Sequence, residues 1–197
     1  MTFKSGPLLV VFLLFLKVPG LAAHPAPHSS IELTIQKTEV IAKLKVPLRE
    51  LELAFRKGLS DSPKDSVSKF QSELKAYIRS HLSLHSEGGE LWQLSLESDL
   101  TAAGNESSAD LECRLKLVPP QFEVPTKFTL VSDLVRHEVV NHQLFVVLSQ
   151  DFKYQRSPSE AHILGVASYL HNSVVIDRLQ WTVDEFLRTP TKPSPDL

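Results

Sequence analysis

The chain has 197 residues, of which 21 are basic, 23 are acidic and one is a cysteine. This length predicts one domain that is large enough to bury its own apolar core. The slight acidic excess gives no electrostatic reason to bind nucleic acid, and a single cysteine excludes an internal disulfide.

The first 23 residues have the layout of a secretory signal peptide. Lys4 precedes an uninterrupted apolar run at residues 7–16, and small residues follow that run. The run is too short for a membrane anchor, because a bilayer core needs roughly 20 apolar residues. Cleavage after Ala23 makes His24 the new N-terminus, although cleavage after Ala22 also satisfies the small-residue rule. We therefore predict an exported protein, in the periplasm or at the extracytoplasmic membrane face, with a net charge of −4 after cleavage.

The segment that follows reads as a β-hairpin and then as helices. Apolar side chains alternate over residues 30–46, and residues 37–39 suit the turn between two strands. At Pro47 the apolar spacing changes to three and four, which is typical of a helix, and a second helical pattern reaches Leu82 and stops at residues 86–89. These patterns predict a two-helix insertion at about residues 47–85, directly after the first hairpin.

From residue 91 onward, every apolar segment reads as a strand. The densest β-branched and aromatic run lies at residues 128–152, and the alternation over residues 110–118 predicts that Cys113 is a buried structural thiol. The predicted strands here are 110–118, 128–134, 139–152, 163–170 and 174–181. We predict a mainly β fold for residues 24–186, an antiparallel sandwich that is Ig-like or barrel-like. The proline-rich residues 187–197 are expected to form a disordered tail.

Histidines are the candidate metal ligands. His81 and His85 have a spacing that can chelate on one helix face, although the last turn of a helix favours histidine without any metal. His137 and His142 are five residues apart, so they are expected on opposite faces of one continuous strand. An N-terminal His24 offers an amine and an imidazole nitrogen, which suit copper. The predicted ligands are therefore His24, His137 and His142, for a transition metal such as copper or nickel, and no other cofactor is predicted.

Common catalytic motifs are missing from the sequence. It contains no G-x-S-x-G, no H-E-x-x-H and no glycine-rich phosphate loop, and it has only seven glycines. We therefore predict no catalytic residues and a non-catalytic accessory or interaction domain. A small metal-binding protein is the second hypothesis, and a hydrolase whose site has no recognisable motif is the third.

Two stretches resemble the extracytoplasmic N-terminal region of HupE/UreJ-like membrane proteins. They are HPAPHSSIELTIQKTEVIAKLKVPLRELELAF and LVPPQFEVPTKFTLVSDLVRHEVVNHQLFVVLSQD, and the second contains Asp133, His137 and His142. The resemblance covers most of residues 24–182 and implies an accessory domain beside a membrane-protein partner. Members of that group continue into a multi-helix membrane region, whereas this chain stops at Leu197. We therefore expect a stand-alone version of the domain or a fragment, and transport is not carried over.

Overall fold

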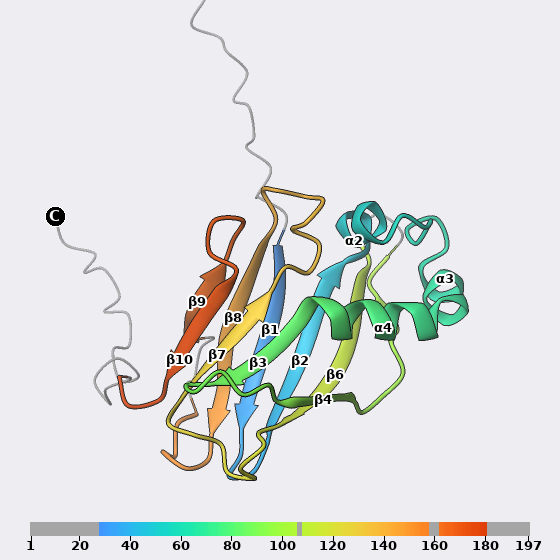
Figure 1. The fold of residues 1–197 in the computed structure, drawn as a ribbon. Coiled ribbons are helices and arrows are strands. Elements are labelled where there is room, and N and C mark those ends of the chain that lie inside the picture. Colours follow the sequence, from blue (N-terminus) through green and yellow to red (C-terminus); the bar gives the residue numbers. More distant parts are fainter. Residues whose placement is uncertain (1–27, 106–107, 158–161, 181–197) are drawn as a thin grey trace, which may run out of the picture.

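The residues that the computed structural model describes are 28–105, 108–157 and 162–180. They form two β-sheets and three α-helices, and the smaller sheet lies across one face of the larger sheet (Figure 1). The predicted signal peptide at residues 1–23, the candidate ligand His24 and the predicted tail at residues 187–197 lie outside the described residues.

The first two strands form the predicted hairpin. β1 (His28–Ile35) and β2 (Val40–Pro47) pair antiparallel, with Ile31 opposite Leu44. Alternate side chains of β1 are buried, as a strand with one face on the core requires. The prediction for this hairpin is confirmed.

The larger sheet has seven strands and is mixed. Its strand order is β4-β6-β2-β1-β8-β9, and the seventh strand, β5, also pairs with β6. The strands added to β1 and β2 are β4 (Gln93–Leu96), β5 (Thr101–Ala103), β6 (Asp110–Val118), β8 (Gln143–Asp151) and β9 (His162–Ala167). β1 and β8 run parallel, whereas the other described pairs are antiparallel.

The mainly β prediction is therefore confirmed, but the prediction of an antiparallel or barrel-like arrangement is wrong. β1 and β8 are far apart in the sequence, so no tight turn forces them to run in opposite directions. The described strands also leave the larger sheet open at its two ends instead of closing it into a barrel.

The smaller sheet has three antiparallel strands in the order β10-β7-β3. They are β3 (Leu82–Ser86), β7 (Lys127–Ser132) and β10 (Ser173–Asp177). β9 and β10 follow one another in the chain, yet β9 pairs with β8 and β10 pairs with β7. The chain thus passes from the larger sheet to the smaller sheet between β9 and β10.

Three helices follow the first hairpin within the described ranges. They are α2 (Leu48–Phe55), α3 (Pro63–Lys69) and α4 (Gln71–His81). The predicted two-helix insertion at residues 47–85 is wrong in two respects. Its second helix is divided at Phe70, whose ring packs edge-on against Phe55 at 6.0 Å. The helical part also ends at His81, because residues 82–86 pair with β7, a long-range contact that local spacing does not encode.

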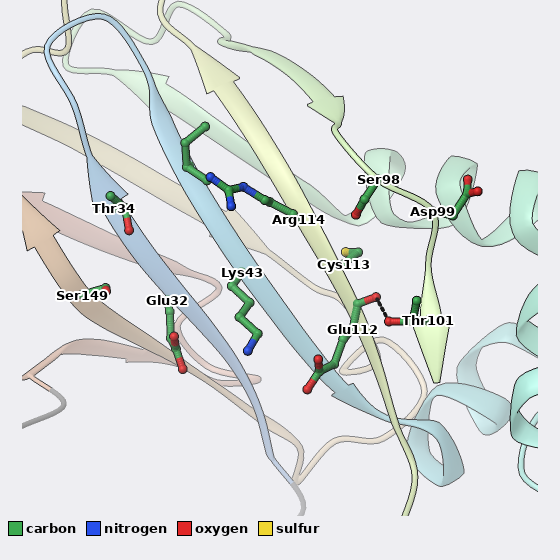
Figure 2. Close-up of a pocket in the computed structure, with 11 residues that line it drawn as sticks. Glu32, Thr34, Lys43, Ser98, Asp99, Thr101, Glu112, Cys113, Arg114 and Ser149 are labelled. Atoms are coloured by element: carbon green, nitrogen blue, oxygen red, sulfur yellow. Dashed lines mark hydrogen bonds between the residues drawn. The ribbon is translucent and has the colours of Figure 1, made fainter. Parts of the chain in front are cut away.

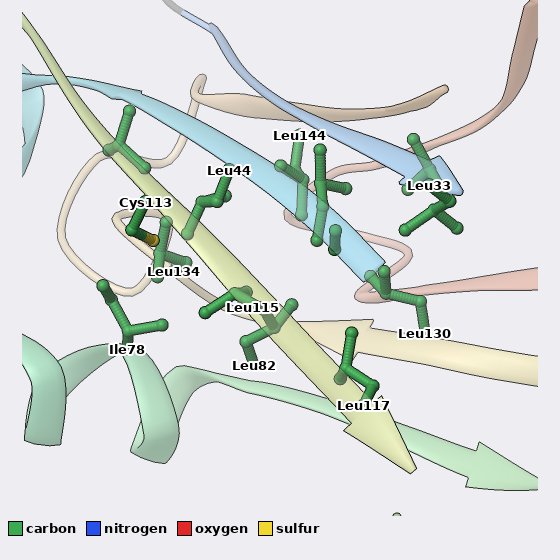
Figure 3. Close-up of a cluster of buried hydrophobic side chains, with 14 of the residues drawn as sticks. Leu33, Leu44, Ile78, Leu82, Cys113, Leu115, Leu117, Leu130, Leu134 and Leu144 are labelled. Carbon is green, nitrogen blue, oxygen red and sulfur yellow. The ribbon is translucent and has the colours of Figure 1, made fainter. Parts of the chain in front are cut away.

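The apolar core lies between the two sheets. Leu33 and Leu44 of the larger sheet and Leu82 and Leu130 of the smaller sheet are buried, and Figure 3 shows these side chains in one cluster. Cys113 belongs to the same cluster, which confirms the predicted buried thiol. None of the helices in the described part of the chain is long and apolar enough to cross a bilayer.

Burial makes Cys113 a poor nucleophile. It raises the pKa of the Cys113 thiol to about 12, from an ordinary value of 9.0. Because only the thiolate attacks disulfide reagents, we expect native Cys113 to react about a thousandfold more slowly with a thiol-exchange dye than it does in denaturant at the same mildly alkaline pH. Absorbance during the labelling reaction measures both rates. Equal rates in the folded and unfolded chain would contradict this prediction.

Candidate metal centre

Strand pairing places His81 next to Asp133. His81 is the last residue of α4, and Asp133 directly follows β7. Leu82 of β3 lies opposite Ser132 of β7, so the next step of the ladder brings His81 opposite Asp133. The Asp133 amide donates to the His81 carbonyl at 3.2 Å, and His81 Nδ1 lies 2.8 Å from Asp133 Oδ1. The register of the smaller sheet therefore positions the first two members of the site.

A tight turn after Asp133 adds His137. The His137 amide donates to the Asp133 carbonyl at 3.3 Å, across a spacing of four residues. The His137 ring stacks on the His81 ring, with centroids 4.4 Å apart and planes 5° from parallel. His81, Asp133 and His137 are hereafter called the His–Asp–His site.

Two contacts hold the loop at residues 133–142 that carries His137. Tyr77 lies one helical turn before His81 on α4, and its hydroxyl oxygen accepts the Val135 amide at 3.0 Å. Arg56, at the end of α2, forms an ion pair with Glu138 at 2.5 Å. Burial raises the pKa of Tyr77 to about 12, so this phenol stays protonated and neutral. The loop is thus attached to two of the helices.

Asp133 determines which nitrogen of each imidazole is available to a metal. Its carboxylate oxygen lies 2.8 Å from His81 Nδ1, and its backbone carbonyl oxygen lies 3.1 Å from His137 Nδ1. Ionised carboxylate and carbonyl oxygens only accept hydrogen bonds, so each Nδ1 carries the proton and each Nε2 of the neutral rings carries a lone pair. Metal-binding histidines in proteins are oriented in this way, by a carboxylate or carbonyl on the other ring nitrogen.

The spacing of the three side chains is close to that of a metal centre. One ligand atom from each of His81, Asp133 and His137 lies within 4.8 Å of the other two. Tetrahedral zinc, with bonds of about 2.0–2.1 Å, places its ligand atoms about 3.4 Å apart, so binding requires the side chains to close slightly. The side chains of His81 and Asp133 are 23% and 52% exposed, which leaves room for that movement.

One of the three predicted metal ligands belongs to this site. His137 is in it, and His142 lies in the same loop but is fully buried, with Nε2 2.8 Å from Ser29 Oγ. The prediction that His137 and His142 lie on opposite faces of one strand is wrong, because residues 133–142 form turns between β7 and β8. Strand periodicity therefore does not apply to them. The position of His24, the third predicted ligand, lies outside the described residues.

Sequence reasoning missed Asp133 and paired His81 with the wrong histidine. His85 does not share a helix face with His81, because it lies in β3, where its Nε2 is 2.9 Å from Ser83 Oγ. The four-residue spacing of Asp133 and His137 was the available signal, since it suits a single turn. Only the pairing of β3 with β7 adds His81 to it.

The buried Ser29–His142 pair lacks two features of a hydrolytic site. Both side chains are almost fully buried, and His142 Nδ1 has no hydrogen-bond partner within residues 28–105, 108–157 and 162–180, so no carboxylate of these residues orients the ring. Burial, followed by the charges of His28 and Arg136, lowers the pKa of His142 to about 4. A base with this pKa and no access to solvent is poorly suited to activating a serine at neutral pH.

A second polar site, the outer hollow, lies on the larger sheet. It has a volume of about 470 Å³, and its charged side chains alternate with core residues of the same strands, so they face away from the core. Figure 2 shows Lys43, Glu112 and Arg114 around it. Glu112 pairs with Lys45 at 3.0 Å, and Arg114 pairs with Glu97 at 2.9 Å. Because neighbours already compensate the charges of Glu112 and Arg114, the hollow has less need of a ligand than the His–Asp–His site.

No protein-family model matches this chain, and no curated protein matches its sequence significantly. The chemistry of the His–Asp–His site therefore carries the functional inference.

Proposed function

We propose that this protein is an exported, non-catalytic domain that binds one divalent transition-metal ion through Nε2 of His81 and Nε2 of His137, with Asp133 orienting both rings. One observation carries the proposal: Asp133 holds both Nδ1 atoms, one with its carboxylate and the other with its carbonyl. Two stacked imidazoles are thereby oriented with their Nε2 lone pairs available.

The ligand set favours nickel, copper or zinc. Imidazole nitrogen suits all three ions, whereas calcium and magnesium prefer sites made of oxygen ligands alone. A structural zinc site closes all four positions with protein ligands, but the described residues supply two ligands here, the imidazoles of His81 and His137. Water or a second molecule therefore fills the remaining positions, and this openness suits exchange of the ion more than permanent storage.

The cellular role that we propose is accessory. The signal-peptide layout of the N-terminus and the resemblance to HupE/UreJ-like proteins both support a place at the extracytoplasmic face of a membrane. There the domain holds a metal ion beside a membrane-protein partner. The acidic net charge of the chain is compatible with attraction of a cation to this surface.

Titration calorimetry with nickel, copper and zinc salts on the full chain tests metal binding. We expect one ion to bind per chain. Asp133→Ala is expected to weaken binding about 10–100-fold, which is the usual effect of removing a group that orients histidine ligands. His81→Ala and His137→Ala each remove a direct ligand and are expected to weaken binding by at least as much.

Two control variants separate this site from the alternatives. His171 is exposed in the turn between β9 and β10, and His171→Ala is expected to bind metal like the wild type. His24→Ala is also expected to bind normally, whereas loss of binding in that variant alone would move the site to the N-terminus. Unchanged affinity in both His81→Ala and His137→Ala would refute the proposed site.

A further inference from the structure

Arg136 is a buried cation with most of its donors unused. It lies in the loop at residues 133–142, and the residue is only 2% exposed. Its Nη1 donates to the Ser168 carbonyl in the turn between β9 and β10. Its Nε and Nη2 are buried and have no hydrogen-bond partner among the described residues, and the same is true of Nδ1 of His142 in the same loop.

An uncompensated guanidinium is costly in this position. Arginine is almost never fully buried unless it is paired, because its charge loses the solvation of water. Burial accordingly lowers the pKa of Arg136, and the nearby charge of Asp133 offsets this effect only in part. Asp133 is not bonded to Arg136, since its carboxylate lies against His81. Within the described part of the chain, the Nε–Nη2 edge of Arg136 therefore lacks the anion that such an edge normally binds.

A second buried arginine in the same protein, Arg178, has the anionic partner that Arg136 lacks within the described ranges. Arg178 uses the same two atoms, Nε and Nη2, to hold both carboxylate oxygens of Asp151 at 2.7 Å. Its Nη1 donates to backbone carbonyls, those of Val124 and Pro125. Arg136 repeats the carbonyl contact through Nη1 and repeats the burial, but the carboxylate is the component that it lacks.

We infer that the Nε–Nη2 edge of Arg136 is a binding site for a small oxyanion, a carboxylate or a phosphoryl group, from outside the chain. Two parallel N–H donors match two oxygens of one anion, and an arginine binds such groups in this bidentate manner. This site is distinct from the His–Asp–His site, because Arg136 is buried whereas the neighbouring His137 is exposed. An anion here connects the loop to the turn at Ser168 through one guanidinium.

Nuclear magnetic resonance of the full chain with ¹⁵N-labelled arginine tests this site directly. The probes are sodium formate, sodium acetate and sodium phosphate, with sodium chloride at the same ionic strength as the reference. We expect the Arg136 Nε–H signal, assigned by its loss in Arg136→Met, to shift and saturate toward the position of the Arg178 signal. A response to formate or acetate identifies a carboxylate ligand, and a response to phosphate alone identifies a phosphoryl ligand.

Thermal unfolding in the same solutions gives a second readout. At about ten times the dissociation constant, the anion is expected to raise the melting temperature of the wild type by about 3–5 °C. Arg136→Met is expected to show only the general salt effect, and so is Arg136→Lys, which keeps the charge but loses the paired donors. Arg114→Met, at an exposed surface arginine, is expected to respond like the wild type.

An Arg136 signal that none of the three anions moves would overturn the inference. Identical thermal responses of the wild type and Arg136→Met would do the same, and would indicate that water fills the site. If Arg136→Met fails to fold, loss of the signal in Arg136→Lys assigns it, and the labelled wild-type chain then gives this answer.

Discussion

Asp151→Asn is expected to lower the free energy of unfolding by about 3–5 kcal/mol, the usual cost of breaking a buried ion pair by removing one partner. Asp151 and Arg178 are both fully buried, and two bonds of 2.7 Å join them. The guanidinium also lies 4.9 Å from the Tyr154 ring. Asparagine has nearly the shape of aspartate but no charge, so the variant leaves the Arg178 cation buried and uncompensated.

The location of this pair explains why the effect is expected to be global. Asp151 is the last residue of β8 in the larger sheet, and Arg178 directly follows β10 of the smaller sheet. Oδ1 of Asp151 also accepts the Lys153 amide at 3.1 Å and the Tyr154 amide at 3.3 Å. One side chain therefore joins the two sheets and also orders the turn that follows β8.

Urea unfolding at neutral pH measures the loss, and two further variants show its cause. Glu87 forms an exposed ion pair with Lys127 at 3.3 Å. Glu87→Ala removes this pair and is expected to lower the free energy of unfolding by at most about 1 kcal/mol. The double variant Asp151→Leu with Arg178→Met is expected to lose less free energy of unfolding than the sum of the losses in its two single variants, because no charge is left uncompensated. A loss below about 1 kcal/mol in Asp151→Asn would show that the pair does not stabilise the fold in this way.

His142 is expected to make the protein less stable as the pH falls. Burial, followed by the charges of His28 and Arg136, lowers the pKa of His142 to about 4 in the folded chain. Its pKa in the unfolded chain is the ordinary value of 6.5. Between these two values the unfolded state binds more protons than the folded state, so the free energy of unfolding decreases as the pH decreases.

The expected size of this effect is large. The full difference between the two pKa values corresponds to about 3 kcal/mol of the free energy of unfolding. This contribution is present above about pH 6.5 and is lost progressively toward about pH 4. His142→Gln has no titrating group at this position and is expected to lose that part of the pH dependence. Urea unfolding curves at several pH values give the change of the free energy of unfolding with pH for the wild type and for His142→Gln.

The control for this prediction is His171→Gln, because His171 is exposed. Its pH dependence is expected to match that of the wild type. A proton titration of the His142 ring by nuclear magnetic resonance checks the cause directly. A native His142 that titrates near its ordinary pKa would contradict the prediction, whatever the unfolding curves show.

The loop at residues 133–142 connects three of these expected results. His137 faces outward in the proposed metal site, whereas Arg136 and His142 are buried on its inner side. Val135, also buried, has a positive φ of 66°, a conformation that β-branched residues rarely adopt. Its amide is held by the Tyr77 hydroxyl, so tertiary contacts maintain a loop shape that the local sequence does not favour.

Predictions from the sequence succeeded where the partners are neighbours in the chain. The alternation of apolar residues over 30–46 was enough to predict the first hairpin, because a short turn joins two strands that each have one buried face. The alternation around Cys113 was enough to place its thiol in the core. The same reasoning failed at residues 82–86, where helical spacing continued the pattern of α4 but pairing with β7 produced a strand.

In the candidate site, too, the sequence pattern finds only the partners that are close together in the chain. Asp133 and His137 are four residues apart, so a single turn brings them together and the sequence contains that signal. His81 is separated from both by the strands β3 to β7 in the sequence, and it reaches them only through the register of β3 against β7. A search for histidine spacings within one element therefore does not find this set.

The sequence by itself determined the mainly β character of this protein, its first hairpin and its buried cysteine. Only the tertiary structure decided that β1 and β8 run parallel and that His81 meets Asp133 and His137. The physical reason is that apolar periodicity reports which face of an element is buried, whereas packing across the whole core selects the strand that pairs with it.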